Sequence, residues 1–421
     1  MRGDYWLYIA ILILIISLAL HQVPLALVSL LFILTGGVSR LWNKYCLHRV
    51  EYKRRLSHNQ VFFGEEIVFE IEINNRKPLP LPWLQVEDEL PERVTLLKGK
   101  ATTSGDDRVT LNNIFPIGMY HRVKRRFPIR CQERGAFVFG PTRIRSGDLF
   151  GFFRREKLID TLDYLIVYPR LVPLEKLGIP SQQLFGDIRL KHHLFQDPVL
   201  TAGVREYQSG DSLKRIHWKS TARVGRLQTK IYEPTTTIDI SIFFDVRTLK
   251  APLWGSNYQL QELGIITAAS ISQHALNAGF RVGLYVNQIT RFSQGMVNVP
   301  HSQHPDQMPR ILEALAQLHQ VETVSMARHI RQEARSLPWG TTLLLIAAQP
   351  DEKLLAALMD LRRVGRSVAL VIIGGASLEG QENLIGHLPV FHVSDDIAWK
   401  LVQEIGLKES GGFSPNDDKH A

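Results

Sequence analysis

The feature that most constrains this chain is an uncharged apolar stretch near its N-terminus. From Tyr5 to Ser39 there is no Lys, Arg, Asp or Glu. Such a stretch cannot be hydrated cheaply, and it exceeds the roughly 20 apolar residues that one membrane span needs. It is a little short for two full spans. The sequence therefore predicts that residues 1–39 lie in a membrane.

The middle of the stretch favours a turn. Pro24 cannot continue a preceding helix but can begin the next one, and the polar residues His21 and Gln22 come shortly before it. We predict two short helices, Tyr5–Leu20 and Pro24–Val38, that form a transmembrane hairpin. A single long helix kinked at Pro24 is the alternative. A cleaved signal peptide is disfavoured, because no small-residue cleavage site precedes the basic flank.

A basic juxtamembrane segment, residues 40–55, follows the apolar stretch. Its only anion is Glu51, and its cations are Arg40, Lys44, Arg49, Lys53, Arg54 and Arg55. Lys and Arg beside a span favour the cytoplasmic side. We therefore expect a plasma-membrane protein whose soluble domains lie on the cytoplasmic side. The chain has only 2 cysteines, too few for a disulfide framework, which is compatible with a reducing compartment.

The charge balance of the 421-residue chain points to anionic partners. It carries 50 Lys and Arg against 41 Asp and Glu, a formal net charge of +9. Such an excess is typical of proteins that contact nucleic acid, an anionic membrane face or an acidic partner.

Residues 122–155 are strongly basic, which predicts contact with anionic lipid headgroups. A solvated sheet face is the alternative for this stretch. Its cations are Arg122, Lys124, Arg125, Arg126, Arg130, Arg134, Arg143, Arg145, Arg154 and Arg155.

Residues 56–160 are predicted to form a small β-sandwich-like domain. The segment Ile67–Ile73 alternates, with Phe69, Ile71 and Ile73 on one face and acidic residues on the other. Short apolar runs bounded by turn residues, such as Gly135–Gly140, are typical of such a domain. Closely spaced prolines argue against a central strand, so we expect an edge strand or loop at Pro78, Pro80 and Pro82.

Residues 236–407 are predicted to form an α/β domain. Expected strands are Ile238–Val246, Arg281–Val286, Thr341–Ala348, Ser367–Gly374 and Val390–Val393. Expected helices are Asn257–Ala278, Asp306–His319, Asp351–Val364 and Asp396–Ile405. Strands that are apolar on both faces and alternate with helices indicate a doubly wound parallel sheet covered on both sides. The polar residues 408–421 are expected to be a disordered tail.

The linking region, residues 161–235, contains the most unusual motif of the chain. Between Arg205 and Lys230 seven cations face two anions, and Ser209–Asp211 marks a tight turn. The motif is predicted to bind a partner. Alternatively, Arg205, Glu206, Asp211 and Arg215 form an ion-pair network that connects the two flanking domains. The candidate residues for either role are Arg205, Glu206, Tyr207, Gly210, Asp211, Lys214, Arg215, Trp218, Lys219 and Arg223.

The motif resembles the signature of a known family. It reads Arg-Glu-Tyr, two residues, Gly-Asp, then a basic pair, Ile, one residue, Trp-Lys and an Ala-Arg. This is similar to the bacterial domain-of-unknown-function 58 family. Three earlier stretches, Arg134–Pro141, Ser146–Gly151 and Tyr168–Arg170, are also similar, so the resemblance covers nearly the whole chain. Departures are mild: Lys214 stands where Arg is common, and Thr221 where Ser is common.

The resemblance implies an architecture and a type of partner. Members of that family often have a transmembrane hairpin, a β-rich segment, this motif and a von Willebrand A-like domain. They are typically encoded near MoxR-type AAA+ ATPases and other membrane proteins, and no enzymatic activity defines them. The resemblance therefore implies an adaptor or assembly protein that binds membrane lipid, an AAA+ ATPase and other membrane proteins, with no small-molecule substrate identified.

Asp245 lies at the position of a metal motif. It ends the first predicted strand of the α/β domain, where ligands bind in open sheets. Von Willebrand A domains that bind Mg²⁺ use Asp-x-Ser-x-Ser there, because these side chains supply hard oxygen ligands. Here Arg247 and Leu249 replace the two serines. We therefore expect no metal and no cofactor. The alternative role of Asp245 is to pair with Arg247 or to cap a turn.

Catalytic motifs are absent from the sequence. It has no GxSxG elbow, no GxxxxGK[ST] loop and no HExxH, so we expect no enzymatic activity. Two other functions compete with the adaptor hypothesis. One is a basic, membrane-associated protein that binds nucleic acid. The sequence contains no recognised nucleic-acid-binding motif, and we expect no nucleic acid among the partners. The other is a cell-envelope enzyme of an unrecognised type.

Overall fold

A computed structural model describes residues 5–97, 101–105, 108–181, 184, 196–234, 238–249, 256–290, 295–319, 323–375, 386 and 388–394. The chain forms two compact units, Met1–Val167 and Tyr168–Ala421, and each is described by itself. The predicted helix Asp396–Ile405 and the predicted tail 408–421 lie outside the described residues.

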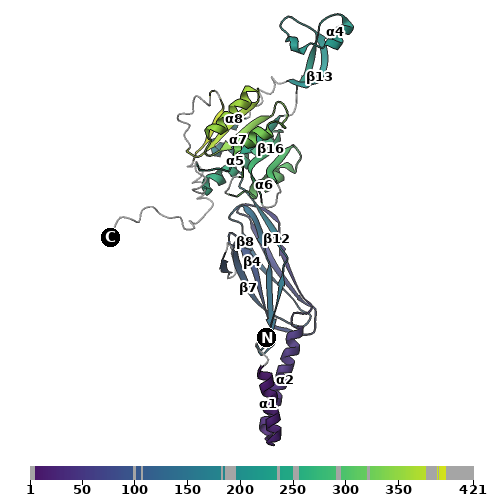
Figure 1. Ribbon diagram of the computed structural model, residues 1–421, viewed down its shortest axis with the longest axis vertical. Helices are drawn as coiled ribbons and strands as arrows, with labels where there is room; N and C mark the ends of the chain where they lie inside the picture. The colour runs from purple at the N-terminus through teal and green to yellow at the C-terminus, as the bar shows by residue number, and fades with distance from the viewer. Residues whose placement is uncertain are drawn as a thin grey trace, which may run out of the picture. The chain divides into compact units, whose positions relative to one another are not determined.

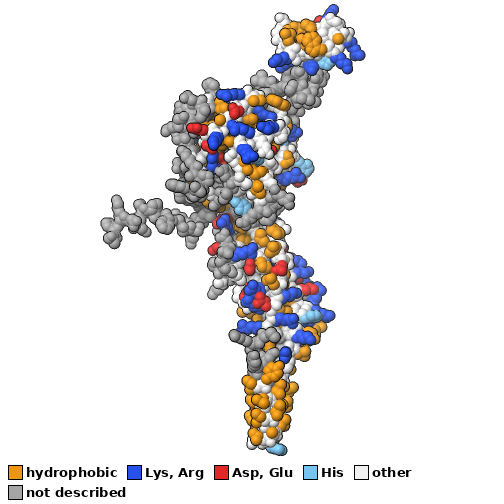
Figure 2. All heavy atoms as spheres, in the orientation of Figure 1, with side chains coloured by type: hydrophobic (Ala, Val, Ile, Leu, Met, Phe, Trp, Pro, Cys, Tyr) orange, Lys and Arg blue, Asp and Glu red, His pale blue; other side chains and the backbone are white. Residues whose placement is uncertain are grey.

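Two apolar helices begin the chain, α1 (Tyr5–Ala19) and α2 (Val23–Tyr45), and they contact each other (Figure 1). Ser17, Ser29 and Gly36 are buried, as expected where small residues let two backbones approach closely. Most of the large apolar side chains are exposed, as Figure 2 shows. Among the described residues, α2 is the one helix long and apolar enough to cross a membrane, and α1 is shorter.

Helix α2 is longer than the sequence predicted. It was expected to end at Val38 and ends at Tyr45. The physical reason is packing, because Trp42 lies against the core of the β sheets that follow and Cys46 is part of that core. The first part of the basic segment 40–55 is therefore helical.

The rest of the first unit is built from β-sheets. The four-stranded sheet has the order β1 (Val50–Leu56), β3 (Glu66–Asn75), β8 (Arg122–Arg130), β5 (Thr95–Leu96). The five-stranded sheet has the order β11 (Arg154–Ile159), β10 (Thr142–Gly147), β4 (Leu81–Pro91), β7 (Arg108–Ile117), β6 (Ala101–Gly105). A three-stranded sheet contains β2 (Gln60–Phe62), β12 (Asp163–Tyr168) and β9 (Gly135–Phe139). Residues from all three sheets share one hydrophobic core.

Strand β3 confirms the predicted alternation. Phe69, Ile71 and Ile73 are buried in the core. On the other face, the acidic residues of β3 pair with the cations of β8. Arg126 Nε lies 2.7 Å from Glu70, and Arg130 Nη2 lies 2.6 Å from Glu66. Part of the basic stretch therefore lies on an ion-paired sheet face.

The prediction of an edge strand or loop at the prolines was wrong for Pro82. This residue lies in β4, a central strand of the five-stranded sheet. The pairing of β4 with β7 shifts register between Leu81 and Leu84. A bulge is the position where a central strand tolerates proline, because an irregular residue there makes no ladder hydrogen bond.

The second unit contains a mixed six-stranded sheet of order β17-β16-β15-β18-β19-β20. Strands β15 (Asp239–Phe244), β16 (Arg281–Ile289), β18 (Thr342–Ala347), β19 (Ser367–Ile373) and β20 (Val390–Val393) are parallel. Helices α5 (Tyr258–Asn277) and α6 (Gln307–Ala316) pack against each other, and so do α7 (Met326–Glu333) and α8 (Glu352–Arg363) (Figure 1). The predicted strands and the first three predicted helices are confirmed, with bounds that differ by a few residues.

An edge strand of this sheet and a short helix beside it were not predicted. Strand β17 (Met296–Ser302) pairs antiparallel with β16 at the edge, so the sheet is not wholly parallel. Helix α7 is only 8 residues long. Strand β17 contains Pro300 and His301 and lacks a continuous apolar run, and its edge position tolerates both features.

Candidate functional site

The motif lies in a β-hairpin with a structured loop. Strands β13 (Gln196–Glu206) and β14 (Gln228–Pro234) pair antiparallel. Between them the chain forms a 3-10 turn, Leu213–Arg215, and the short helix α4 (Trp218–Val224). We call residues 203–231 the motif hairpin. Ile216 and Thr229 form an isolated β-bridge, and both are buried inside it.

Asp211 organises the first half of the loop. Its Oδ1 accepts a hydrogen bond of 2.6 Å from Arg205 Nη2, and its Oδ2 accepts one of 3.0 Å from the backbone N–H of Gln208. The hydroxyl of Thr229 lies 3.4 Å from the same Oδ2. The bond from Arg205 holds the pKa of Asp211 below its usual value. Gly210 has φ +110°, a conformation that favours glycine, which explains the Gly-Asp pair of the motif.

Helix α4 is capped at both ends. The Nδ1 atom of His217 accepts a 3.0 Å hydrogen bond from the backbone N–H of Ser220. At the other end, Gly225 adopts a left-handed conformation, and its N–H donates to Thr221 O at 2.9 Å. The Thr221 hydroxyl accepts a 3.0 Å bond from the N–H of Gln228, at the start of β14. These bonds fix where the side chains of α4 point.

The side chains that this scaffold presents are apolar and basic. Trp218 is 69% exposed. The other exposed large apolar side chains are Val204, Leu213, Val224, Leu227 and Ile231. The exposed cations are Lys214, Arg215, Lys219, Arg223 and Arg226. Figure 2 shows apolar side chains on the hairpin with Lys and Arg at their margins. An apolar patch around an exposed Trp, rimmed by cations, is typical of an interaction surface.

The structure brings some of the predicted motif residues together. Arg205 and Asp211 form an ion pair, as predicted, whereas Glu206 lies 3.6 Å from Arg226, which was not a candidate. Both pairs are internal to the motif hairpin. Tyr207 is half-buried, and its N–H donates to Leu227 O at 2.9 Å. Sequence reasoning missed His217, Thr221 and Thr229, because a supporting role of this kind depends on contacts across the hairpin.

Asp245 lies at the carboxyl end of β15, in the sheet of the second unit. Its Oδ1 accepts hydrogen bonds from the backbone N–H of Arg247 at 3.1 Å and from Asn287 Nδ2 at 2.8 Å. The guanidinium of Arg247 lies between two carboxylates. Its Nη2 is 3.8 Å from Asp245 Oδ2, and its Nη1 is 3.0 Å from Asp351 Oδ2. The predicted pairing of Asp245 with Arg247 is confirmed.

Arg247 therefore supplies the positive charge at this end of the sheet. A further bond from its Nη2 to Gln349 O at 3.1 Å holds the guanidinium in place, and its side chain is mostly buried. In the part of the chain that the structure describes, no group of three or more His, Cys, Asp or Glu side chains could hold a metal ion. The site thus contains a buried salt bridge within the chain.

A Ser–His pair lies near the other end of β15. Ser241 Oγ and His301 Nε2 are 2.9 Å apart. A side chain at Gly283 would approach His301 to 3.2 Å, so glycine there leaves room for the imidazole. Sequence reasoning missed this pair because β17, which carries His301, was not predicted. Ser241 has no exposed surface, so in this conformation the pair has a packing role and its hydroxyl cannot meet a substrate.

Comparison with known proteins agrees with the motif. A family model described as "Protein of unknown function DUF58" matches residues 203–380. An uncharacterised Bacillus subtilis protein, YeaD, is 25% identical over 217 residues, which are 51% of this chain and 51% of that protein. The matched segment thus spans about half the length of that relative.

Solved structures show only distant similarity. The CARDB domain of a Pyrococcus furiosus protein is 11% identical, with a TM-score of 0.19, and covers 28% of this chain and 89% of that domain. A cohesin module from a Clostridium perfringens glycoside hydrolase is 10% identical, with a TM-score of 0.21, and covers 28% of this chain and 96% of the module. Neither similarity bears on the function of this chain. Residues 203–380 of this chain thus match the family described as protein of unknown function DUF58, in agreement with the resemblance that the motif indicated.

Proposed function

We propose that this protein is a membrane-anchored cytoplasmic adaptor or assembly protein that binds a protein partner, a MoxR-type AAA+ ATPase. In this proposal α1 and α2 form a transmembrane hairpin, and the cations at Arg40 and Lys44 keep the α2 end at the inner leaflet. The exposed apolar side chains of both helices support an anchor. We expect further membrane proteins among the partners.

We assign the sheet of the second unit to a von Willebrand A-like domain. Its strand order, with one antiparallel edge strand, supports this assignment. The charge of Arg247 occupies the region where a metal-binding member of that class would hold its cation. This domain would therefore bind its partner without a bridging metal.

The motif hairpin is the observation that carries the proposal. Its loop is fixed by Asp211 and by both caps of α4. A rigid loop loses little entropy on binding. Exposed Trp and Arg side chains are the types that contribute most to binding energy at protein interfaces. The rim of cations predicts a partner surface that is acidic around an apolar depression.

A capture experiment tests the role of the hairpin. The full-length protein is used as bait in detergent-solubilised membranes, and the recovery of the AAA+ ATPase is measured. Trp218→Ala and Arg215→Glu should each reduce recovery strongly, because they remove the aromatic anchor or reverse a rim charge. Trp218 is exposed, so Trp218→Ala should change the free energy of unfolding by no more than about 0.5 kcal/mol.

Matched controls make this experiment decisive. Trp339 is 65% exposed in the second unit but lies outside the hairpin, and Arg328 is an exposed arginine on α7. Trp339→Ala and Arg328→Glu should leave recovery unchanged. If Trp218→Ala captures as much ATPase as the unaltered protein, the hairpin is not the contact.

Nucleic acid is the second candidate partner, because an exposed Trp among cations can also stack on bases. This candidate predicts binding of single-stranded fragments that weakens steeply with salt. A titration at low salt that shows no binding would exclude it.

A further inference from the structure

We call the three sheets of the first unit, β1 to β12, the β unit. The end of the β unit that adjoins α2 carries a second set of apolar and basic side chains. Hydrogen bonds from two side chains join this end to the last turn of α2 and the residues just after it. Arg155 Nη1 donates to Lys44 O at 2.7 Å. Lys77 Nζ donates to Cys46 O and, at 3.0 Å, to His48 O. Two loops of the β unit are therefore held beside the end of the apolar helix.

The first loop connects β10 to β11 and has an apolar tip. Leu149 is 62% exposed and Phe150 is 58% exposed, and the rings of Phe150 and Phe152 stack with centroids 5.9 Å apart. The buried carboxylate of Asp148 shapes the loop. It accepts hydrogen bonds from the backbone N–H groups of Phe150, Phe152 and Phe153 at 3.1, 3.3 and 2.7 Å. The chain thus holds a set of exposed aromatic side chains in a fixed conformation.

The second loop, Gly118–His121, has the same character. Met119 and Tyr120 are exposed large apolar residues. Asn75 Nδ2 donates to Gly118 O at 2.8 Å, and the N–H of Tyr120 donates to Lys77 O at 3.2 Å. Because Lys77 also binds the chain just after α2, this tip lies at the same end of the unit as Phe150.

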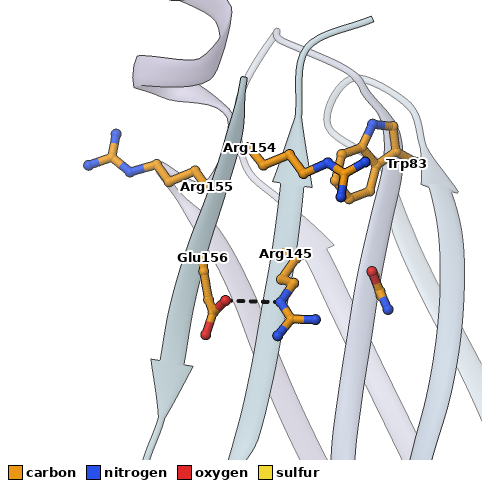
Figure 3. A pocket seen from close by; sticks show the side chains of 6 residues that line it. Trp83, Arg145, Arg154, Arg155 and Glu156 are labelled. Atoms are coloured by element: carbon orange, nitrogen blue, oxygen red, sulfur yellow. Dashed lines mark hydrogen bonds and ion pairs between the residues drawn. The ribbon is translucent and has the colours of Figure 1, made fainter. Parts of the chain in front are cut away.

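A basic pocket adjoins the first loop. It has a volume of 420 Å³ and is lined by Trp83, Gln85, Arg145, Arg154, Arg155 and Glu156. In Figure 3, Arg154 points from β11 across β10 toward Trp83. The register places Gly147 between them, and a side chain on Gly147 would come within 2.9 Å of the Trp83 ring. Glycine therefore keeps this side of the pocket open.

The cations of the pocket differ in their partners. Arg145 pairs with Glu87 at 2.7 Å and with Glu156 at 2.9 Å. For Arg154, no carboxylate among the described residues lies within ion-pair distance, and Arg155 donates to a backbone oxygen of α2. Arg154 thus presents an unneutralised guanidinium group to the pocket, whereas Arg155 points away from Trp83 in Figure 3. A guanidinium group binds phosphate oxygens well.

We propose that this pocket binds the phosphate headgroup of an anionic phospholipid while the tips of the two loops enter the membrane interface. This inference rests on the proposed membrane anchor and adds a specific lipid site to it. Charge complementarity supports a phosphate. The phosphate is expected to come from a lipid, because Arg155 connects the pocket residues of β11 to the end of the apolar helix α2. Aromatic and long apolar side chains next to cations are the combination that favours the headgroup layer.

The test uses the full-length protein in lipid nanodiscs. Leu149→Cys is labelled with a bimane fluorophore, and quenching by nitroxide-labelled phosphatidylglycerol is compared with quenching by the equally labelled phosphatidylcholine. Background is measured on the unaltered chain, whose Cys46 and Cys131 are buried. The control site is Glu92→Cys, which is exposed just beyond the end of β4 at Pro91. The strand end lies about 26 Å along β4 from Trp83 at a rise of about 3.3 Å per residue.

We expect quenching of the Leu149 label and none of the Glu92 label. Nitroxide phosphatidylglycerol should quench more strongly than the phosphatidylcholine lipid. Arg154→Gln should lower the preference for phosphatidylglycerol by roughly fivefold, because it removes one cation from the anionic membrane surface. Lys157→Gln, which removes an exposed cation of β11 outside the pocket, should not alter it.

The outcomes separate this inference from the anchor. Equal quenching of the two label sites, or no preference for phosphatidylglycerol in the unaltered protein, would overturn the lipid site. Flotation of the same preparation with lipid after alkaline washing tests the anchor independently. A protein that floats but shows no quenching keeps its anchor and loses the lipid site.

Discussion

At the scale of single residues, buried or half-buried polar groups shape both loops that we assign to binding. Asp211 in the motif hairpin and Asp148 in the β10–β11 loop each accept backbone N–H bonds near the start of a turn. Asp211 also pairs with Arg205 across the hairpin. The Gly-Asp pair of the motif was recognisable from sequence as a turn. Its contacts with Gln208 and Thr229 depend on hairpin register, which sequence alone did not supply.

The first prediction concerns Asp211. Asp211→Ala should speed amide hydrogen exchange at Gln208 and its neighbours, because the N–H loses its acceptor and Arg205 loses its partner. Ser212→Ala is the control, since the Ser212 side chain makes no capping bond. Because pairing lowers the pKa of Asp211, the protection should be present at neutral pH and lost as the pH falls through that lowered value. Equal exchange in the two variants would contradict this role.

The second prediction concerns Lys77. Burial lowers its pKa to about 8. The unfolded chain then binds a proton between pH 8 and about 10.5 that the folded chain does not, so the contribution of Lys77 to stability rises with pH across that window. The contribution is lost as the pH falls through about 10.5 toward 8.

The measurement is the free energy of unfolding in detergent from pH 8 to 10.5. Lys77→Met should remove a rise that amounts to at most about 3 kcal/mol. Lys53→Met, at an exposed lysine on β1, should leave the pH dependence unchanged. If unfolding of Lys77→Met and of the unaltered protein shows the same pH slope, Lys77 is not buried as described.

At the scale of secondary-structure elements, a salt bridge lies at the carboxyl end of β15. Arg247 connects Asp245 at the end of β15 to Asp351, which caps α8 and accepts a 2.8 Å bond from the N–H of Leu354. The salt bridge therefore joins a strand end to a helix start.

The third prediction concerns this bridge. Arg247→Ser should lower the free energy of unfolding by about 3 kcal/mol, because it leaves the buried carboxylate of Asp245 without a cation. Mg²⁺ should restore part of the loss, since the change returns a hydroxyl beside two carboxylates. Thermal unfolding with and without Mg²⁺ checks this. If Arg247→Ser measured without Mg²⁺ is as stable as the unaltered protein, the salt bridge does not stabilise the fold as proposed.

The elements that sequence predicted well are those with a continuous period. Ile67–Ile73 alternates, and the inner strands of the six-stranded sheet are apolar throughout. Elements whose stability comes from tertiary contact were missed or misjudged. Strand β17 is an edge strand with a proline, α7 is a short helix that packs against α8, and the last turns of α2 are supported by the β core. Pro82 was misjudged because a bulge cannot be identified from composition.

At the scale of the whole molecule, the chain combines an apolar helix pair, a β unit with a basic end and a second unit that carries the motif hairpin. The sequence predicted the apolar helix pair, the β-rich and α/β segments and the motif. It did not identify the arrangement of exposed apolar side chains around Trp218, because exposure depends on how α4 is capped. The adaptor hypothesis therefore depends most on what the hairpin contacts in the cell.

Photocrosslinking in intact cells tests that claim most directly. A photoreactive amino acid replaces Leu213 in one chain and Trp339 in another, and both chains are recovered from the membrane fraction after irradiation. We expect the Leu213 position, but not the Trp339 position, to crosslink to the AAA+ ATPase. Recovery of the protein in the aqueous fraction, or a crosslink to the ATPase from Trp339 and none from Leu213, would contradict the account.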